Sequence, residues 1–348
     1  MKVAPMIDIA LYPLSERSRF AALFDRPTSA EGSLGWFDSL AANTLYPGEE
    51  AVMAVAVQGG LPRAALPLVR NGSAVRALTA PYTTVYEPAL PKPDCAWALG
   101  AGAARYVTGT LRLDAIDPAN KDVEAFLEGL RASELVGTRY RHFINRYERV
   151  AGFDDYWSAR PSRLRATTRR KLAQAGDKAE FRCYRNSLDE AVATYEDIYR
   201  ASWKPAEPHP QFIGNMVEAL ARSGFVRIGI MALAGRPVAA QIWLVCRRRA
   251  TIFKLAHRQG YADHSPGTLL TRWMISHLIG EDCLEEIDFG RGDDTYKRDW
   301  LCDARPRIGV VAGHWKSLVG CRAIAREVLP TRLSLLVHKA LDACGQVR

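Results

Sequence analysis

Apolar and polar positions follow two different rhythms along the second half of this chain. Apolar residues spaced three or four positions apart predict helices at residues 162–175, 188–203, 211–222 and 265–279. Short β-branched or alternating runs predict strands at residues 180–184, 225–233, 236–245, 250–257, 286–290 and 307–314. Ser187 is expected to cap the second helix, prolines break residues 204–210, and residues 258–264 are expected to form a loop. The order β-α-α-β-β-β-α-β-α-β mixes hairpins with crossovers and predicts an α/β (α+β) fold with a mixed sheet.

One strand–turn–strand pattern occurs in both halves of the sequence. Residues 51–69 read as strand, Gly-Gly-Leu-Pro turn and strand, and residues 225–245 repeat this order around Gly-Arg-Pro. A length of 348 residues also favours about two domains. We therefore predict similar halves, with domains at residues 1–150 and 151–318 and a helical tail at 319–348.

Composition narrows the class of protein further. Hydrophobic content of 48% and charged content of 24% are ordinary for a globular protein. Seven scattered cysteines include no Cys-x-x-Cys pair, so we expect reduced thiols and no metal site. A signal peptide and an uncharged apolar run of about eighteen residues are both missing, which favours a cytoplasmic protein.

The net charge of +9 is concentrated in one stretch. Residues 139–185 hold thirteen lysines and arginines but five acidic residues. Such a stretch suits a phosphate-bearing cofactor, a nucleic acid or an anionic membrane at the inner membrane face, and a solvated helix face between domains explains it equally well.

The segment from Glu285 to Trp300 has the highest density of side chains that can bind a ligand or transfer a proton. A strand that alternates Glu286, Asp288 and Gly290 with apolar residues runs into a second glycine, two aspartates, Tyr296 and Lys297. Ligands bind at the carboxyl ends of strands in open α/β sheets, so this turn is a candidate site. A strand-to-helix turn with Asp293 or Asp294 as a cap and a solvated charged face is the alternative.

A second candidate lies at the start of the helix at residue 265. Ser265 can cap the helix, Pro266 suits its first position, and Gly267 and Thr268 let a ligand approach the backbone. Free amides at a helix start bind phosphate oxygens, although an ordinary capped helix has the same sequence.

Other polar residues on the predicted strands could also have either a functional or a purely structural role. Lys254 lies within a strand and must reach water, an acid or a ligand. Gln241 shares a strand face with Trp243 and either binds an acceptor or satisfies backbone groups. His257 ends its strand and is a reserve base, or is simply structural. The motifs of serine hydrolases, P-loop enzymes and zincins are missing.

The element order and several motifs together resemble the Fem-like, CelD-like branch of the GNAT acyltransferase superfamily. The resemblance covers residues 153–319 and rests on the segments Gly-Arg-Pro-Val-Ala-Ala-Gln (235–241), Lys-Leu-Ala (254–256), Ser-Pro-Gly (265–267) and Asp-Phe-Gly (288–290). It implies two GNAT-like domains with mixed, mainly antiparallel sheets, the first of them without the transferase motif. It also implies that the helix at Ser265 holds the diphosphate of coenzyme A, with added charge from Arg258.

For the chemistry, the resemblance implies a general acid at Tyr296 and a lysine at Lys297 that stabilises negative charge. Asp288 or Asp293 is expected to act as the base, and Arg291 is a further substrate-binding candidate. We expect acyl-CoA as co-substrate and an amine acceptor, either a lipid amine such as a sphingoid base, as in bacterial ceramide synthases, or an amino sugar of the envelope. An aminoacyl-tRNA donor, as in Fem-type peptidyltransferases, and a non-catalytic binding protein remain the alternatives.

Overall fold

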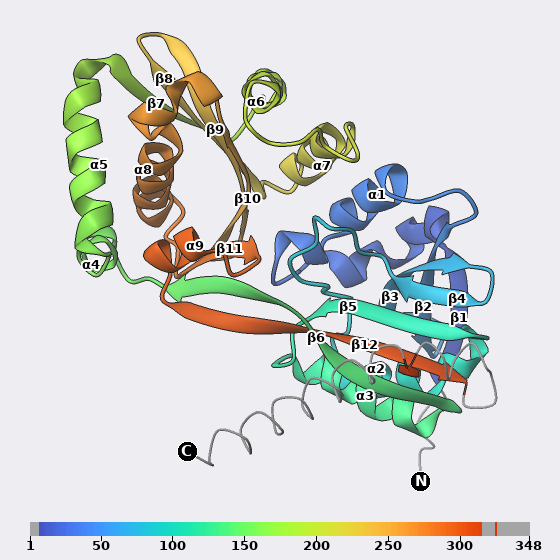
Figure 1. The fold of residues 1–348 in the computed structure, drawn as a ribbon. Helices are drawn as coiled ribbons and strands as arrows, with labels where there is room; N and C mark the ends of the chain where they lie inside the picture. Colours follow the sequence, from blue (N-terminus) through green and yellow to red (C-terminus); the bar gives the residue numbers. More distant parts are fainter. Residues whose placement is uncertain (1–6, 315–323, 326–348) are drawn as a thin grey trace, which may run out of the picture. The chain divides into compact units, whose positions relative to one another are not determined.

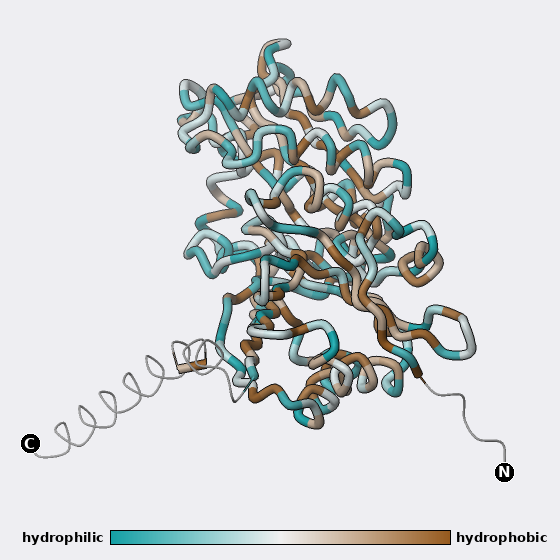
Figure 2. The backbone as a smooth tube through the Cα atoms, turned by 90° about the vertical axis from the view of Figure 1, so that its right-hand side faces the viewer, coloured by the Kyte–Doolittle hydropathy of each residue, from teal (hydrophilic) through white to brown (hydrophobic). Residues whose placement is uncertain are grey.

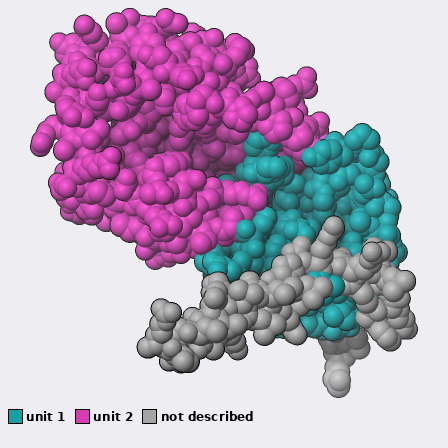
Figure 3. Space-filling view, in the orientation of Figure 1, with its two compact units in different colours: residues 1–25, 45–142, 306–348 teal, residues 26–44, 143–305 magenta. Residues whose placement is uncertain are grey.

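The computed structural model describes residues 7–314 and 324–325. The chain forms two compact units, which Figure 3 distinguishes by colour. Unit 1 comprises residues 1–25, 45–142 and 306–348, and unit 2 comprises residues 26–44 and 143–305. Most of the helical tail expected at residues 319–348 lies outside the described residues.

The described strand pairings of unit 1 are antiparallel, except for one parallel pair. Its strands follow the order β1-β2-β3-β4-β5-β12-β6, and β4 and β5 are the parallel pair. The strands are β1 (Ile7–Pro13), β2 (Glu50–Gln58), β3 (Leu61–Asn71), β4 (Ala74–Ala77), β5 (Thr110–Ile116), β12 (Asp303–His314) and β6 (Leu135–Arg149), which continues into unit 2. The helices are η1 (Leu14–Phe24), α2 (Pro93–Ala101), η3 (Ala103–Arg105) and α3 (Lys121–Ala132). Both η1 and α2 pack on β2 and β3, whose middle residues are consequently buried.

Unit 2 has a mixed sheet with helices on both faces. Its strands follow the order β6-β11-β10-β9-β8-β7, and only β10 and β11 pair in parallel among the described pairings. The strands are β7 (Ala179–Tyr184), β8 (Val226–Leu233), β9 (Arg236–Cys246), β10 (Arg249–His257) and β11 (Glu286–Arg291). The helices are η2 (Ala30–Gly32), α1 (Leu34–Asn43), α4 (Phe153–Ser158), α5 (Ser162–Ala175), η4 (Gly176–Lys178), α6 (Asp189–Arg200), α7 (Phe212–Ala221), η5 (Gln259–His264), α8 (Pro266–Glu281) and α9 (Thr295–Trp300). Figure 1 shows α5 and α8 on one side of this sheet and α6 and α7 on the other.

The core of unit 2 lies between α8 and the sheet. Trp243 on β9, Met274 on α8 and Ile287 on β11 are fully buried in one hydrophobic cluster. Gly229 on β8 permits this packing, since a Cβ there would lie 2.4 Å from the Met274 sulfur. Hydrophobic residues follow the central strands in Figure 2, whereas hydrophilic residues dominate the outer turns.

Residues 26–44 come from the first half of the sequence but belong to unit 2. Trp36 on α1 is completely buried and packs edge-on against Phe212 and Phe253, with ring centroids 5.8 Å away in each case. The guanidinium of Arg247 donates to the carbonyl oxygen of Pro27 at 2.9 Å. The sequence-based domains are continuous ranges and do not include such an exchanged segment. The boundaries at residues 150 and 318 therefore stay a prediction.

The predicted fold class and the order of elements in the second half are confirmed, with local corrections. Ser187 does not cap α6, because its left-handed backbone (φ 51°) leaves Leu188 at the cap position without a side-chain bond. Residues 259–264 form the 3₁₀ helix η5 rather than an open loop. The hairpin at residues 51–69 is present as β2 and β3.

Candidate active site

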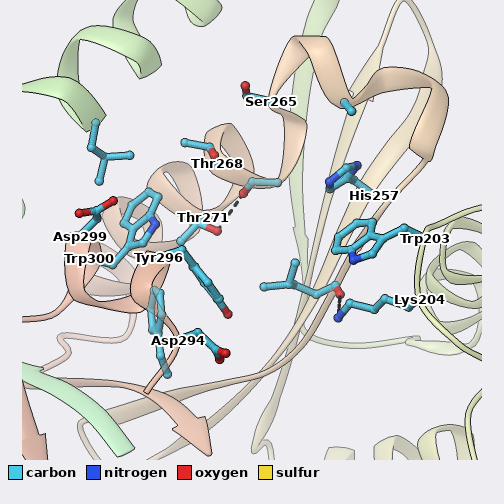
Figure 4. A pocket seen from close by; sticks show the side chains of 15 residues that line it. Trp203, Lys204, His257, Ser265, Thr268, Thr271, Asp294, Tyr296, Asp299 and Trp300 are labelled. Atoms are coloured by element: carbon cyan, nitrogen blue, oxygen red, sulfur yellow. Dashed lines mark hydrogen bonds between the residues drawn. The ribbon is translucent and has the colours of Figure 1, made fainter. Parts of the chain in front are cut away.

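A cavity of about 560 Å³ opens in unit 2 beside the start of α8 (Figure 4). Its apolar walls come from residues of six different segments, and polar side chains reach into it from α8, α9, β10 and the loop after α6. The lining residues are Leu164, Trp203, Lys204, Leu255, His257, Ala262, Ser265, Gly267, Thr268, Thr271, Phe289, Asp294, Tyr296, Asp299 and Trp300. The volume suits a small ligand or the reactive end of a larger one.

Divergence of two parallel strands creates the cavity. Pairing between β10 and β11 stops at Thr251 and Asp288, although β10 continues to His257 and β11 to Arg291. Leu255 on β10 and Phe289 on β11 lie beyond the last pair, and both line the cavity. The sheet therefore opens a gap at the carboxyl ends of its parallel strands, as expected for a ligand site.

The start of α8 presents unpaired amides to this gap. Ser265 occupies the cap position with left-handed backbone (φ 51°), and its hydroxyl forms no cap bond, contrary to the sequence-based expectation. The amide of Leu269 donates to the carbonyl oxygen of Ser265 at 3.1 Å. The amides of Gly267 and Thr268 have no acceptor among the described residues, and both residues line the cavity. Two N–H groups at the positive end of a sixteen-residue helix are thus available to an anion.

His257 stands at the end of β10 against this helix start. Its ring lies 4.4 Å from the ring of Trp203, and its Cδ2 is 3.4 Å from the position a Cβ on Gly267 would take. Its Nδ1 lies 3.2 Å from the carbonyl oxygen of Arg258. A carbonyl oxygen only accepts, so Nδ1 carries the proton in this contact and Nε2 is left as an acceptor. The structure therefore brings His257 to the cavity in a form that can take a proton.

Tyr296 lies on α9 and reaches the cavity from the other side (Figure 4). Burial and the nearby Asp294 carboxylate raise the pKa of its hydroxyl to about 12, although 47% of the residue surface is exposed. The phenol consequently stays protonated at neutral pH and can donate a hydrogen bond. The predicted site residues that line the cavity are thus His257, Ser265, Gly267, Thr268 and Tyr296.

Lys297 is buried behind the turn between β11 and α9. Its ammonium donates to the carbonyl oxygens of Phe289 at 2.9 Å, Arg291 at 2.7 Å and Gly292 at 3.4 Å. Positive φ angles at Gly290 (62°) and Gly292 (105°) fold the backbone so that these oxygens converge. Burial lowers the pKa of the ammonium from its usual range. The ammonium is thus bound by three backbone oxygens and lies 3.6 Å from the Asp294 carboxylate, and the residue does not line the cavity.

The two acids expected to act as base are both engaged elsewhere. Asp288 is buried, accepts the Gly290 amide at 2.6 Å and pairs with Arg305 at 2.7 Å. Asp293 lies between Arg146 at 2.6 Å and Arg298 at 2.7 Å, and hydrogen bonds from these guanidiniums lower its pKa to about 2. Neither acid lines the cavity, and Asp294 at the cap position of α9 forms no cap bond.

The remaining binding candidates from the sequence also lie away from the cavity lining. The Gln241 amide donates to the Thr271 hydroxyl at 2.6 Å and accepts from the indole of Trp243 at 2.9 Å. This buried network fixes α8 on β9 and leaves no polar group of Gln241 free for a substrate.

Three cationic candidates have protein partners instead of a ligand. Lys254 pairs with Glu207 at 2.6 Å. Arg258 pairs with Asp197, and its Nε donates to the carbonyl oxygen of Pro237 at 2.9 Å. The guanidinium of Arg291 lies 4.6 Å from the ring centroid of Phe143. None of the three lines the cavity.

Several cavity residues were missed by the sequence reasoning. Trp203 was placed at the end of the predicted helix at residues 188–203, but α6 ends at Arg200, and Lys204 was assigned to a stretch marked only as proline-rich and irregular. Asp294 was considered only as a helix cap and Asp299 was not singled out, although both line the cavity beside the predicted site residues. The Trp-Lys pair just before three prolines was the available signal, since such a segment positions rigid aromatic and charged groups.

The cavity combines a helix start with two unpaired amides, a histidine and a protonated phenol between diverging parallel strands. The comparisons with known proteins give the class of the domain that carries this cavity. Residues 162–298 match the acetyltransferase (GNAT) domain family. Residues 162–298 therefore form a GNAT acyltransferase domain, and the fold of the chain is similar to that of FemX, in line with the resemblance to the Fem-like branch that the sequence showed.

Solved structures with a similar fold cover almost the whole chain. FemX has a TM-score of 0.60 at 10% identity, over 88% of this chain and 96% of that one. The C-terminal domain (DUF2156) of a putative lysylphosphatidylglycerol synthetase from Agrobacterium fabrum has a TM-score of 0.55 at 12% identity, over 88% and 94%. L-PGS from Bacillus licheniformis has a TM-score of 0.52 at 10% identity, over 92% and 98%. None of the curated proteins matches the sequence.

Residues 7–314 contain no group of three or more histidine, cysteine or acidic side chains arranged to hold a metal ion. Within the same part of the chain, no helix is both long and apolar enough to cross a membrane.

Proposed function

We propose that this protein is an acyl-CoA-dependent N-acyltransferase that moves an acyl group from a thioester to an amine. The observation that carries the proposal is the pair of unpaired amides at Gly267 and Thr268, which open onto a cavity also lined by His257 and Tyr296. An anion site and two groups able to exchange protons in one cavity are what a thioester donor with a diphosphate requires.

The donor fits the start of α8 by its charge. The diphosphate of coenzyme A would accept from the amides of Gly267 and Thr268, where the helix dipole favours negative charge. The gap between β10 and β11 would then receive the thioester arm, with Leu255 and Phe289 as apolar contacts. Arg258, which the sequence suggested for this purpose, is held by Asp197 and is left out of the proposed donor site.

The acceptor would bind through its positive charge and its apolar part. Asp294 and Asp299 line the cavity, and carboxylates attract an alkylammonium. Leu164 and Trp300 offer apolar walls nearby. A lipid amine such as a sphingoid base uses both features, whereas an amino sugar uses mainly the carboxylates. The proposal therefore favours a lipid amine taken from the inner membrane face.

The chemistry would proceed by direct attack of the amine on the thioester carbonyl carbon. The bound ammonium first loses one proton to water, which leaves a neutral amine. The C–N bond then forms, the C–S bond breaks, and Nε2 of His257 takes the second proton from the nitrogen. Tyr296, protonated at neutral pH, would donate a hydrogen bond to the leaving sulfur, which regains a proton as the free thiol. Coenzyme A supplies the activated acyl group, and the protein supplies position and proton transfer.

Turnover with a panel of donors tests the reaction itself. Purified protein is incubated with short- and long-chain acyl-CoAs and with sphingoid bases, amino sugars and simple alkyl amines. Free thiol release and product masses are followed together. Thiol release that requires an amine supports the proposal, and no thiol release with any donor would reject it. A preference for sphingoid bases on anionic vesicles would support the lipid acceptor and the membrane contact.

A charge change at the helix start tests the donor site. Gly267→Glu places a carboxylate beside the free amides, where it stabilises the helix by about 0.3–1 kcal/mol while repelling a diphosphate. Gly267→Gln has the same size without the charge and controls for contact with His257. We expect coenzyme A to bind the Glu variant at least tenfold more weakly than the Gln variant in calorimetry. Equal affinities would place the diphosphate elsewhere.

An aminoacyl-tRNA donor is the second candidate, and one surface favours it. Arg163, Arg169 and Arg170 on α5 are exposed and form no ion pair with any acid in the described part of the chain. Helix α5 packs on α8 and contributes Leu164 to the cavity. Binding of tRNA that weakens steeply with salt, together with aminoacyl transfer, would favour this donor over coenzyme A.

A further inference from the structure

Lys204 enters the cavity from the loop that follows α6. Its ammonium donates to the carbonyl oxygen of Leu255 at 2.6 Å, on the part of β10 that no longer pairs with β11. The same loop is tied down by Glu207, which pairs with Lys254 at 2.6 Å, and by Pro205, whose carbonyl oxygen accepts from Tyr199 at 2.9 Å. The chain that follows Lys204 is therefore fixed by two contacts.

Lys204 is the one lysine or arginine among the residues that line the cavity. Among the described residues no carboxylate forms an ion pair with it, and its nearest ring contact is Trp203, 5.7 Å from the ammonium to the ring centroid. The bond to Leu255 uses one of its three protons. The other two are available to an acceptor inside the cavity, which Tyr296 enters from the opposite side (Figure 4).

The environment of Lys204 destabilises its charge until a negative group arrives. Burial, followed by repulsion from Lys254, lowers the pKa of the ammonium to about 8. The group is still mainly protonated at pH 7, and it gains most when an oxyanion forms nearby. A structural role in holding the loop does not require the side chain to line the cavity, as that of Lys204 does.

We propose that Lys204 is a catalytic residue, whose ammonium donates a hydrogen bond to the acyl carbonyl oxygen as the amine attacks and negative charge develops there. This inference rests on the proposed acyl transfer. The ammonium keeps its proton throughout, so the balance of the reaction is unchanged: the amine proton goes to His257 and the thiolate regains one. Lys204 thus takes the part that the sequence resemblance gave to Lys297.

The proposal sets the sign of the pH dependence. The active form requires protonated Lys204, so kcat should fall as pH rises through about 8. In Lys204→Arg the guanidinium stays protonated at every accessible pH, so this alkaline decline should disappear. A neutral lysine acting as a base would give the opposite trend, with kcat rising through the same range.

The experiment compares Lys204→Met, Lys204→Arg and the exposed control Lys178→Met with the wild type. We expect Lys204→Met to lower kcat about 100- to 1,000-fold, as loss of an oxyanion donor does, with KM for the donor changed less than threefold. Lys204→Arg should recover at least tenfold of that loss and lack the alkaline decline. Lys178→Met should match the wild type, and circular dichroism should show all variants folded.

The outcomes separate this inference from the function on which it rests. No thiol release by the wild type would overturn both. Wild-type turnover that Lys204→Met retains would overturn the role of Lys204 alone. An arginine variant as slow as the methionine variant, or with the wild-type alkaline decline, would also overturn it.

Discussion

Replacing Lys297 by methionine tests whether this lysine supports the fold or the chemistry. The residue is 5% exposed, and its ammonium bonds to the carbonyl oxygens of Phe289, Arg291 and Gly292 at 2.9, 2.7 and 3.4 Å. Methionine keeps the length of the side chain but donates nothing. The substitution therefore leaves the convergent carbonyls of the β11–α9 turn without a donor.

The cost follows from these contacts. A buried acceptor left without its partner costs about 1–3 kcal/mol, and two of the three bonds are short. Relief from burying an ammonium offsets part of this loss. We expect unfolding free energy to fall by about 2–4 kcal/mol, which for a domain of this size lowers Tm by about 4–16 °C.

Thermal and urea unfolding of Lys297→Met, followed by circular dichroism, measure this change. Lys178→Met serves as the control, because that lysine is exposed on η4 and should alter stability by less than about 0.5 kcal/mol. Turnover will also fall, since the same turn positions Tyr296. A variant that melts like the wild type yet has lost turnover would refute this reasoning, and would restore Lys297 as a group that acts on the substrate.

Two further predictions concern the cavity and the exchanged segment. Tyr296→Phe should reduce kcat about 100- to 10,000-fold, because the variant has no hydroxyl to act as the acid. Its Tm should stay within about 2 °C of the wild type, since a partly exposed hydroxyl contributes little to folding. An unchanged kcat would show that Tyr296 is not the acid. Trp36→Ala should destabilise unit 2 by about 3–5 kcal/mol and make residues 26–44 accessible to protease, which mass spectrometry of the fragments would detect. Cleavage as slow as in the wild type would show that the Trp36 indole does not hold this segment in place.

Periodicity predicted the second half of the fold because its elements follow local rules. Helix α5 matches its predicted residues 162–175, and β8 and β9 form the predicted hairpin around a glycine with φ of 76°. The assignment of residues 26–44 to unit 2 had no such signal. It depends on Trp36 packing against Phe212 and Phe253, contacts between residues more than 170 positions apart in the sequence.

The helix start at α8 was predicted for the right position but for a partly wrong reason. Serine, proline and glycine signalled a helix N-terminus, and the helix begins at Pro266. The expectation that Ser265 would cap it failed because its backbone is left-handed. The missing cap leaves the amides of Gly267 and Thr268 unpaired, which strengthens the case for an anion there.

Side-chain roles were the least predictable part, because sequence proximity cannot show which side of a turn a residue faces. Asp288 and Lys297 lie in the segment with the densest chemistry, yet Arg305, the Gly290 amide and three carbonyls hold them. The turn after β11 contains two glycines with positive φ, and its buried carbonyl oxygens need hydrogen-bond donors. Polar side chains in this segment therefore bond to the turn instead of to a substrate. Those polar residues make the turn that carries Tyr296.

Lys204 illustrates the converse. Nothing local marks it, because its surroundings come from Leu255 on β10 and from Lys254, some fifty positions further along the chain. A lysine whose protons are all bound by fixed carbonyls cannot respond to charge that develops in a substrate, whereas one with protons facing a cavity can. On that ground the two lysines exchange the roles that their sequence positions suggest: Lys297 holds the turn, and Lys204 is the group free to meet an oxyanion.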